Sequence, residues 1–347
     1  MMELPTSRIP DPADAPVLRW GLLGTGWIAA KFAASLTAHT AQRIVAVGSR
    51  NQESADRFAR EVGADAAYGS YEALVAAPDI DVIYIATPHH LHHAHAVLAI
   101  EAGKHVLIEK PIAVSHREAQ EIAATAQRAG VFAMEALWTL FTPKYDVIRQ
   151  LLPRLEVETV LADMGEYFAP EHRIFDAELA GGPLFDLGAY PLSLALWALG
   201  SATAVAAAGT PAANGINGQL AITLQAERGL AALHCSILGE TPTTATLAGP
   251  DATLRLDGPF YQPGGFTVTT RAGQRLRYDE PTSAHEGGLC FEAAEVARRI
   301  TAGELDSPLR PLADSVELLR VMDLIRHQVG IANPSSQPRG VTGSPGR

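Results

Sequence analysis

The chain has 347 residues, of which 47% are hydrophobic and 19% charged, and its formal net charge is −11 at pH 7. This balance is typical of a soluble globular protein and excludes a disordered or fibrous chain. The length favours two domains over one. The charge is spread along the sequence without clusters of Lys and Arg, which argues against a nucleic-acid partner because phosphate contacts need concentrated positive charge.

The sequence also indicates the cellular compartment of the protein. No apolar run reaches the ~18 residues that a membrane-spanning helix needs, so we expect no membrane partner. Residues 1–16 contain four prolines and four charged residues but no hydrophobic stretch of a secretory signal, which predicts a flexible arm and a cytoplasmic protein. Two cysteines, Cys235 and Cys290, are too few for a disulfide framework, and their apolar neighbours predict reduced, buried thiols.

Short apolar runs alternate with amphipathic stretches through residues 17–136. The runs are VLRWGLLG, RIVAVGS, DVIYIAT, KHVLIE and GVFAM, and continuous Val, Ile and Leu of this kind is typical of parallel strands buried on both faces. Helical patterns lie between them at residues 28–36, 54–62, 71–77, 92–101 and 117–129. Strand alternating with helix predicts an α/β domain built on a doubly wound parallel sheet.

The pattern changes in residues 137–332. Strand-like segments separated by Gly, Pro or Asn turns predict an open, mainly antiparallel sheet. Helical patterns occur at residues 183–199, 288–301 and 311–329, which makes this an α+β domain. The segments are VETVLADMGEYF, TAVAAAGT, GQLAITLQ, GLAALHCSIL, TTATLAG, ATLRL, FTVTT and QRLRY. Residues 333–347 are rich in Pro, Gly and Ser and are predicted to be a disordered tail.

A glycine pattern follows the first predicted strand. WGLLGTGWIAAKF places Gly24, Gly26 and Ala29 as G-x-G-x-x-A at the start of a helix, where they allow a tight turn, close approach of a pyrophosphate and close helix packing. The helix N-terminus offers free N–H groups to phosphates. An ordinary glycine turn is the alternative, but the place at the first strand–helix junction favours a dinucleotide. The cofactor contacts would include Thr25, Trp27 and Ile28.

The second predicted strand ends in AVGSRN. An NAD-selective site would usually have Asp or Glu here for the ribose 2′-hydroxyl, whereas this chain has Ser49 and Arg50. Arg50 can pair with a 2′-phosphate through two parallel hydrogen bonds, which a carboxylate would repel. We therefore expect NADP(H) to be preferred over NAD(H). The alternative is that Arg50 is a solvent-facing arginine without a ligand.

Five histidines stand within seven residues, at positions 89, 90, 92, 93 and 95. Their i,i+3 spacing could supply half of a zinc site, but no cysteine or helical His-x-x-x-Glu partner lies near, so we expect no metal. The preceding ATP ends a predicted parallel strand, and cofactors lie outside the carboxyl ends of such strands. This predicts Thr87, Pro88 and His92 at the nucleotide cleft and the other histidines exposed on the helix.

IEKPIAVS puts Glu109 and Lys110 directly after the apolar residues 106–108, at the ligand end of the next strand. There both residues would border the cofactor. A lysine in this position can hydrogen-bond a substrate hydroxyl or carbonyl and, if partly desolvated, help to move its proton. The alternative is a salt bridge at the strand end between Glu109 and a neighbour, and the residues alone leave both interpretations open.

In this order GTGWIA, ATPHHLHHAHA and EKPIAVS resemble the Gfo/Idh/MocA oxidoreductases. The resemblance runs from about Leu18 to Gln328 and is sharpest at FAMEALWTLFTP, GGPLFDLGAYPL and SPLRPLADSVELLRVMDLIR. These segments are most similar to the branch of dimeric dihydrodiol and NADP-dependent D-xylose dehydrogenases. The resemblance implies a Rossmann domain followed by an α+β domain with an open antiparallel sheet.

The resemblance also implies site residues. Lys110 matches the catalytic lysine of the family, and Asp186 and Tyr190 match its D-x-x-x-Y motif. Four residues apart at a helix start, the two would share one face. Tyr190 would relay a proton with its pKa lowered by Lys110, and Asp186 would orient the pair. Without the family, a helix-capping aspartate and a core tyrosine would be the alternative.

Three further residues are expected at the substrate. Trp138 and Phe141 would form an apolar wall, with ordinary core packing as the alternative, and Arg173 would contact the substrate. The expected activity is NADP(H)-dependent hydride transfer at a hydroxyl carbon of a small neutral sugar, cyclitol or trans-dihydrodiol. An NAD-dependent glycosidase or a silent sugar-sensing regulator stays open. The resemblance also implies a homodimer or higher homo-oligomer through the open sheet, where Ala232, His234 and Ser236 alternate with apolar residues.

Overall fold

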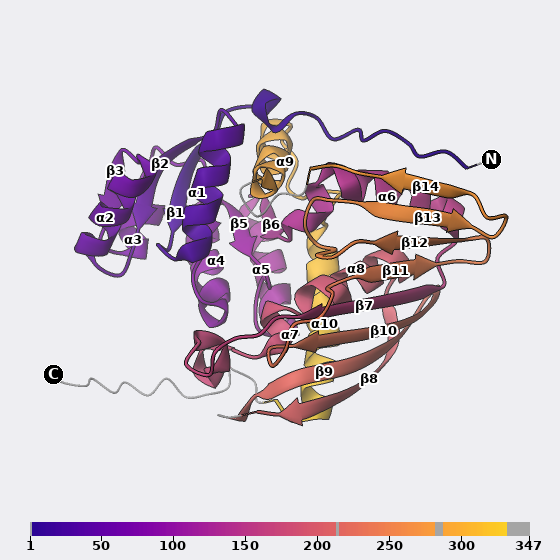
Figure 1. Ribbon diagram of the computed structural model, residues 1–347. Coiled ribbons are helices and arrows are strands. Elements are labelled where there is room, and N and C mark those ends of the chain that lie inside the picture. Colours follow the sequence, from indigo (N-terminus) through magenta and orange to yellow (C-terminus); the bar gives the residue numbers. More distant parts are fainter. Residues whose placement is uncertain (1, 213–214, 282–286, 332–347) are drawn as a thin grey trace.

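The computed structural model describes residues 2–212, 215–281 and 287–331, which form two sheets (Figure 1). The first described sheet has six parallel strands in the order β3-β2-β1-β4-β5-β6. They are β1 (Arg19–Leu23), β2 (Arg43–Gly48), β3 (Ala66–Tyr68), β4 (Val82–Ile85), β5 (His105–Glu109) and β6 (Ala133–Ala136). The strand order reverses between β1 and β4, where open α/β sheets bind their ligands. The predicted doubly wound parallel sheet is confirmed.

Helices connect these strands, and short polar side chains begin three of them. The side chains of Asn51, Ser70 and Ser115 each accept a backbone hydrogen bond from the residue three positions on, which satisfies an N–H that a helix start leaves free. Left-handed Gly63 and Gly130 end two of the helices. The helices are α1 (Trp27–His39), α2 (Gln52–Val62), α3 (Tyr71–Val75), α4 (His92–Glu101) and α5 (His116–Ala129).

The second sheet has eight strands among the described residues, in the order β14-β13-β12-β11-β7-β10-β9-β8. Among the described strands of this sheet only β7 and β10 pair in parallel, so the predicted mainly antiparallel sheet is confirmed. The strands are β7 (Thr159–Gly165), β8 (Ala202–Pro211), β9 (Asn217–Ala226), β10 (Gly229–Ser236), β11 (Ala245–Ala248), β12 (Ala252–Leu256), β13 (Phe266–Thr270) and β14 (Arg275–Tyr278). Helices α7 (Pro183–Asp186) and α8 (Ala189–Leu199) pack on one face of it.

The last two helices return to the first sheet. Helix α9 (Leu289–Thr301) packs against α1, and its Ala293 and Val296 belong to the same buried cluster as Trp20 and Phe32. Helix α10 (Leu312–Val329) lies between α5 and β8 and so touches elements of both sheets (Figure 1). Of these two helices, α10 is the one that connects the two sheets by packing.

Several elements differ from the sequence-based expectation. Strand β3 and helix α6 (Pro143–Leu155) were not predicted; α6 begins with a proline, which suits a helix start, but Pro153 inside it obscures the helical pattern. The helix expected over residues 183–199 is two helices, α7 and α8, because the chain turns at Leu187 and Gly188. The predicted tail at residues 333–347 lies outside the described residues.

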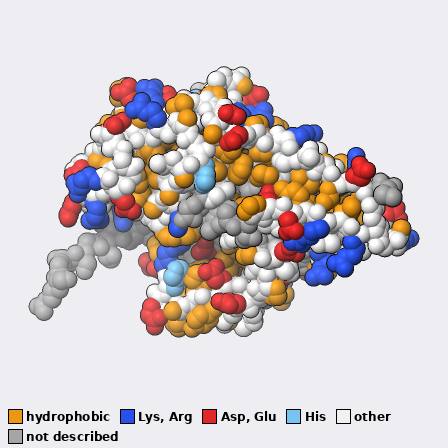
Figure 2. Space-filling view, turned by 45° about the horizontal axis from the view of Figure 1, so that its top comes forward, with side chains coloured by type: hydrophobic (Ala, Val, Ile, Leu, Met, Phe, Trp, Pro, Cys, Tyr) orange, Lys and Arg blue, Asp and Glu red, His pale blue; other side chains and the backbone are white. Residues whose placement is uncertain are grey.

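The N-terminal segment runs from the first domain across α6 to the edge of the second sheet (Figure 1). Met2 and Gln274 exchange two hydrogen bonds, of 3.1 and 2.9 Å, and the Arg8 amide donates to Asp146 at 2.7 Å. Acidic and basic side chains are mixed over the face shown in Figure 2. Across the described ranges, no helix combines the length and apolar character of a membrane span.

Candidate active site

The turn from β1 to α1 requires glycine. Gly24 has a φ of +112°, and a Cβ at this position would lie 2.7 Å from the carbonyl oxygen of Ala86. Gly26 caps α1 with no side-chain hydrogen bond, and Ala29 is fully buried where the helix meets the sheet. Backbone N–H groups at such a helix start bind phosphate, so this turn fits the pyrophosphate of a dinucleotide.

Ser49 and Arg50 follow β2 at the same edge of the sheet. The Ser49 side chain is buried, and its amide donates to the Tyr68 carbonyl at 3.0 Å. Arg50 is exposed. Burial raises the pKa of the neighbouring Tyr71, and the charge of Arg50 opposes that rise. Asn51 is occupied in capping α2. Arg50 is thus an exposed cation at the edge of the sheet where β1 and β2 end.

His92 joins the two loops that follow β4 and β5. It is fully buried, with Nδ1 2.7 Å from the carbonyl oxygen of Pro111 and Nε2 2.8 Å from that of Thr87. Burial lowers the pKa of His92, although both carbonyl contacts favour the charged ring. The side chain therefore lies inside the wall of the cleft, while Pro88 is exposed beside it.

The other histidines are half-buried, which corrects the expectation that they are exposed. His95 Nδ1 lies 3.0 Å from the Thr87 hydroxyl, and His93 Nε2 lies 3.0 Å from the Glu121 carboxylate of α5. Burial lowers the pKa of His89 to about 3. The histidines are half-buried because α4 packs against α5 and because His89 lies beside the loop of residues 177–179. The described part of the chain holds no His, Cys, Asp and Glu group suited to a metal.

Lys110, Asp186 and Tyr190 come together from both domains. Lys110 Nζ donates to the backbone carbonyl of Asp186 at 2.7 Å and lies 3.5 Å from its Oδ1. The same ammonium lies over the Tyr190 ring, 5.0 Å from its centre. Asp186 ends α7 and Tyr190 lies in α8, so a chain turn separates them and they do not share the face of one helix.

Charge and burial act differently on the two partners of Lys110. Burial alone would raise the pKa of Asp186, but Lys110, followed by His89 and Arg173, outweighs it and lowers the pKa. Burial raises the pKa of Tyr190 well above its ordinary value, and Tyr261 adds to the rise. The prediction that Lys110 lowers the pKa of Tyr190 is therefore wrong, because burial dominates and the ammonium faces the ring, 5.0 Å from its centre. The Tyr190 hydroxyl accepts a hydrogen bond from the Trp138 indole at 3.2 Å, which opposes the rise without cancelling it.

Glu109 points away from solvent. Its carboxylate accepts hydrogen bonds from the Tyr84 hydroxyl and, at 3.1 Å, from the Lys110 amide. Burial raises the pKa of Glu109 to about 7. Among the described residues it makes no side-chain ion pair, so the strand-end salt bridge considered from the sequence is absent there. Glu109 instead ties β5 to β4 beneath the lysine.

Trp138 and Phe141 lie in the 3₁₀ helix η3 (Trp138–Phe141) and are both buried. Trp138 reaches the site through its bond to Tyr190, and a Cβ at Gly288 would lie 2.0 Å from its ring. Phe141 packs in the core cluster around Phe32, which is the ordinary packing considered for it. Of the pair, Trp138 is the one that contacts a predicted catalytic side chain.

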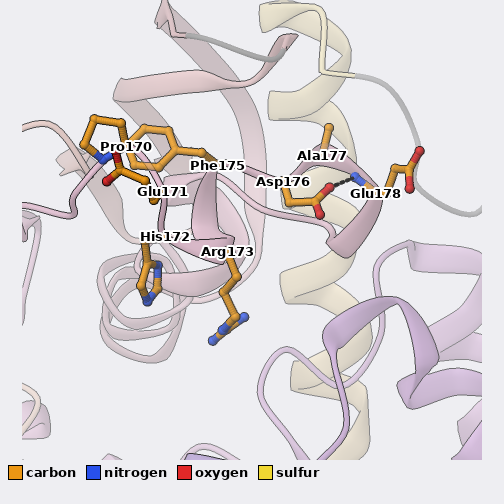
Figure 3. A pocket seen from close by; sticks show the side chains of 8 residues that line it. All are labelled: Pro170, Glu171, His172, Arg173, Phe175, Asp176, Ala177 and Glu178. Atoms are coloured by element: carbon orange, nitrogen blue, oxygen red, sulfur yellow. Dashed lines mark hydrogen bonds between the residues drawn. The ribbon is translucent and has the colours of Figure 1, made fainter. Parts of the chain in front are cut away.

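Arg173 extends from a loop over the site. Its Nη2 lies 3.8 Å from Asp186 Oδ2, and the side chain is 56% exposed. The loop lines an open pocket of ≈ 510 Å³. The side chains of His172 and Arg173 point to the same side of it (Figure 3). The pocket is lined by Pro170, Glu171, His172, Arg173, Phe175, Asp176, Ala177 and Glu178.

Two residues at the site had no sequence signal. The Tyr261 ring lies 4.5 Å from the Tyr190 ring, in a turn-rich stretch far along the chain. Glu166 follows β7; burial raises its pKa, and the charge of Asp186 adds to the rise while that of Lys110 opposes it. In the sequence Glu166 stands inside the strand-like segment VETVLADMGEYF, which gave no indication of a place at the site. Both residues border the same set of side chains as Lys110.

Known protein families match both domains of the chain. Residues 18–137 match an oxidoreductase family with an NAD-binding Rossmann fold, and residues 156–255 match the Gfo/Idh/MocA C-terminal domain. Trans-1,2-dihydrobenzene-1,2-diol dehydrogenase of Xenopus tropicalis is 30% identical over 330 residues, 91% of this chain and 99% of the relative. The enzyme of the same name from Sus scrofa is 31% identical over 335 residues, 92% of this chain and 99% of the relative.

Solved structures resemble the whole chain. Levoglucosan dehydrogenase, in complex with NADH and levoglucosan, superimposes with a TM-score of 0.82 at 18% identity, over 91% of this chain and 98% of that one. Aldose-aldose oxidoreductase from Caulobacter crescentus, complexed with glycerol, gives 0.80 at 21% identity, over 91% and 98%. These likenesses show the fold. With both domains matched and full-length relatives at 30% identity or more, the chain belongs to the Gfo/Idh/MocA family of NAD(P)-dependent oxidoreductases.

Proposed function

We propose that the protein transfers a hydride between NADP(H) and a hydroxyl-bearing carbon of a small neutral sugar, cyclitol or trans-dihydrodiol. The observation that carries this proposal is the meeting of Lys110 Nζ with Asp186, beside Tyr190, at the carboxyl ends of the parallel strands. Full-length relatives named for dihydrodiol oxidation support the substrate class. The exposed Arg50 after β2 supports the 2′-phosphorylated cofactor.

The side chains around Lys110 define the proton chemistry. The bound nicotinamide supplies the hydride acceptor or donor. Lys110 Nζ and the Tyr190 hydroxyl hold the reacting oxygen, and Lys110 exchanges its proton with it. Because Trp138 donates to the Tyr190 hydroxyl, the hydrogen of that hydroxyl is free to point at a substrate. Asp186 fixes the lysine through its backbone carbonyl and its carboxylate.

We propose that two copies pair through the helix-free face of the second sheet. Leu161 on β7 and Leu230 on β10 are 49% and 54% exposed there. The neighbouring Leu233 and Cys235 are buried on the opposite face, so side chains alternate as the sequence indicated. Ser236, expected on the open face, is buried and accepts from the Leu238 amide. No nucleic acid or membrane partner is proposed.

The reaction is tested by following NADPH formation with purified protein, NADP⁺ or NAD⁺, and D-xylose, D-glucose, cyclitols and trans-dihydrodiols. Lys110→Ala should lower kcat by ~10²- to 10⁴-fold, the usual contribution of a proton-transferring side chain, while the Kd for NADP⁺ stays within about threefold. Lys104, which precedes the same strand and donates to Ala77 and Ile80, supplies the control Lys104→Ala. Wild-type turnover in Lys110→Ala would overturn the mechanism.

A further inference from the structure

A charged network lies buried behind the lysine loop. Glu135 of β6 is fully buried, and Arg310 is 3% exposed. Arg310 donates to Glu135 Oε2 from Nη2 at 2.5 Å and from Nε at 3.0 Å, and the Ser315 hydroxyl donates to the same oxygen at 2.8 Å. Burying such a pair carries a desolvation cost that apolar side chains of similar volume would avoid. Its presence calls for a role beyond stability.

The second oxygen of Glu135 supplies that role. Oε1 accepts a hydrogen bond of 2.9 Å from the amide of Ile112, two residues after Lys110. The two preceding residues are held as well: Glu109 Oε2 accepts from the Lys110 amide at 3.1 Å, and His92 Nδ1 lies 2.7 Å from the Pro111 carbonyl oxygen. Three consecutive residues of a loop thus each have a side-chain partner on their backbone.

Fixing this backbone matters because Lys110 crosses between the domains. Its ammonium must reach Asp186 of α7, and misplacement of a reacting group by about 1 Å can cost about a hundredfold in rate. Arg310 and Ser315 belong to the segment that enters α10, which packs on elements of both sheets. The network therefore links the lysine loop to the part of the chain that joins the two domains.

We propose that Glu135 is a positioning residue for Lys110: held by Arg310 and Ser315, its carboxylate fixes the Ile112 amide and so the backbone from which Lys110 reaches Asp186. Glu135 itself does not touch the reacting atoms. The inference rests on the proposed role of Lys110 in hydride transfer. According to this inference, the ion pair between Glu135 and Arg310, which lie 175 positions apart in the sequence, affects the rate of catalysis.

Two matched double variants separate this role from stability. Glu135→Gln/Arg310→Met removes both charges but retains an amide oxygen that can accept from Ile112. Glu135→Leu/Arg310→Met removes the same charges and the acceptor. Replacing both members avoids leaving one buried charge unpaired, which is the costly change. If the Leu pair fails to fold, Glu135→Asp against the wild type makes the same comparison, because aspartate keeps the charge but is one methylene too short for the Ile112 amide.

Three sets of quantities are measured on the full-length protein. They are the amide hydrogen exchange rates of residues 108–114, kcat and KM with a substrate that the wild-type protein turns over, and the Kd for NADP⁺. Relative to the Gln pair, the Leu pair should exchange at Ile112 at least tenfold faster and show a kcat at least tenfold lower. KM and the Kd for NADP⁺ should change less than threefold. Equal exchange rates, or faster exchange with equal kcat, would overturn the inference. Wild-type protein without turnover on any substrate would count instead against the proposed reaction, since exchange needs no substrate.

Discussion

At the residue scale, cofactor choice depends on Arg50. The side chain is exposed after β2, and no carboxylate occupies the neighbouring positions Ser49 and Asn51. Arg50→Ala should raise the KM for NADP⁺ by about 10- to 100-fold, because a charge-assisted hydrogen-bonded pair contributes about 1.5–3 kcal/mol. The KM for NAD⁺, which lacks the 2′-phosphate, should stay within about twofold.

Arg60→Ala is the matched control for this measurement. Arg60 is an exposed arginine in the last turn of α2, so its loss removes the same charge from the same region without touching the end of β2. Steady-state kinetics with both nucleotides should separate the two variants. An equal loss of NADP⁺ affinity in both would mean that general electrostatic attraction, and not a contact to Arg50, sets the preference.

At the scale of elements, the β1–α1 turn leaves no room for a side chain at Gly24. Gly24→Ala combines a left-handed φ of +112° with a Cβ 2.7 Å from the Ala86 carbonyl oxygen, so the turn must move. Gly63→Ala, at the end of α2, has a similar strain at φ +73° but meets no atom within 4 Å. We expect both to lower the free energy of unfolding by about 1 kcal/mol or more. Calorimetric titration should show a Kd for NADP⁺ at least tenfold higher in Gly24→Ala alone, and equal affinity in both would remove this turn from the cofactor site.

The same elements show what sequence can predict. Local patterns predicted five of the six described parallel strands, the glycine turn and the lysine after β5, because each depends on residues adjacent in the chain. The raised pKa of Tyr190 comes mainly from burial, and Tyr261 reaches its ring from 71 positions away. Such effects arise from packing between distant segments, which periodicity does not encode. The break between α7 and α8 was missed because apolar residues continue on both sides of Asp186, Leu187 and Gly188, so the pattern reads as one helix.

At the scale of the whole molecule, the open face of the second sheet predicts association. Leu161 of β7 and Leu230 of β10 lie on neighbouring strands, where Leu230 pairs with Thr159, so the two leucines are close on one surface. Burying an exposed leucine contributes about 1.5–3 kcal/mol, and in a symmetric pair each substitution acts twice. Leu161→Glu/Leu230→Glu should therefore shift the protein from two chains to one in sedimentation velocity.

The control is Leu305→Glu, which changes a leucine of similar exposure, 43%, in the loop between α9 and α10. It should sediment as the wild type does. If the wild-type protein sediments as a single chain at micromolar concentration, the pairing surface is wrong, and the exposed leucines are ordinary surface residues. If the double variant dissociates yet keeps its kcat, each active site is complete within one chain. This outcome is expected, since Lys110, Asp186 and Tyr190 all meet within a single copy.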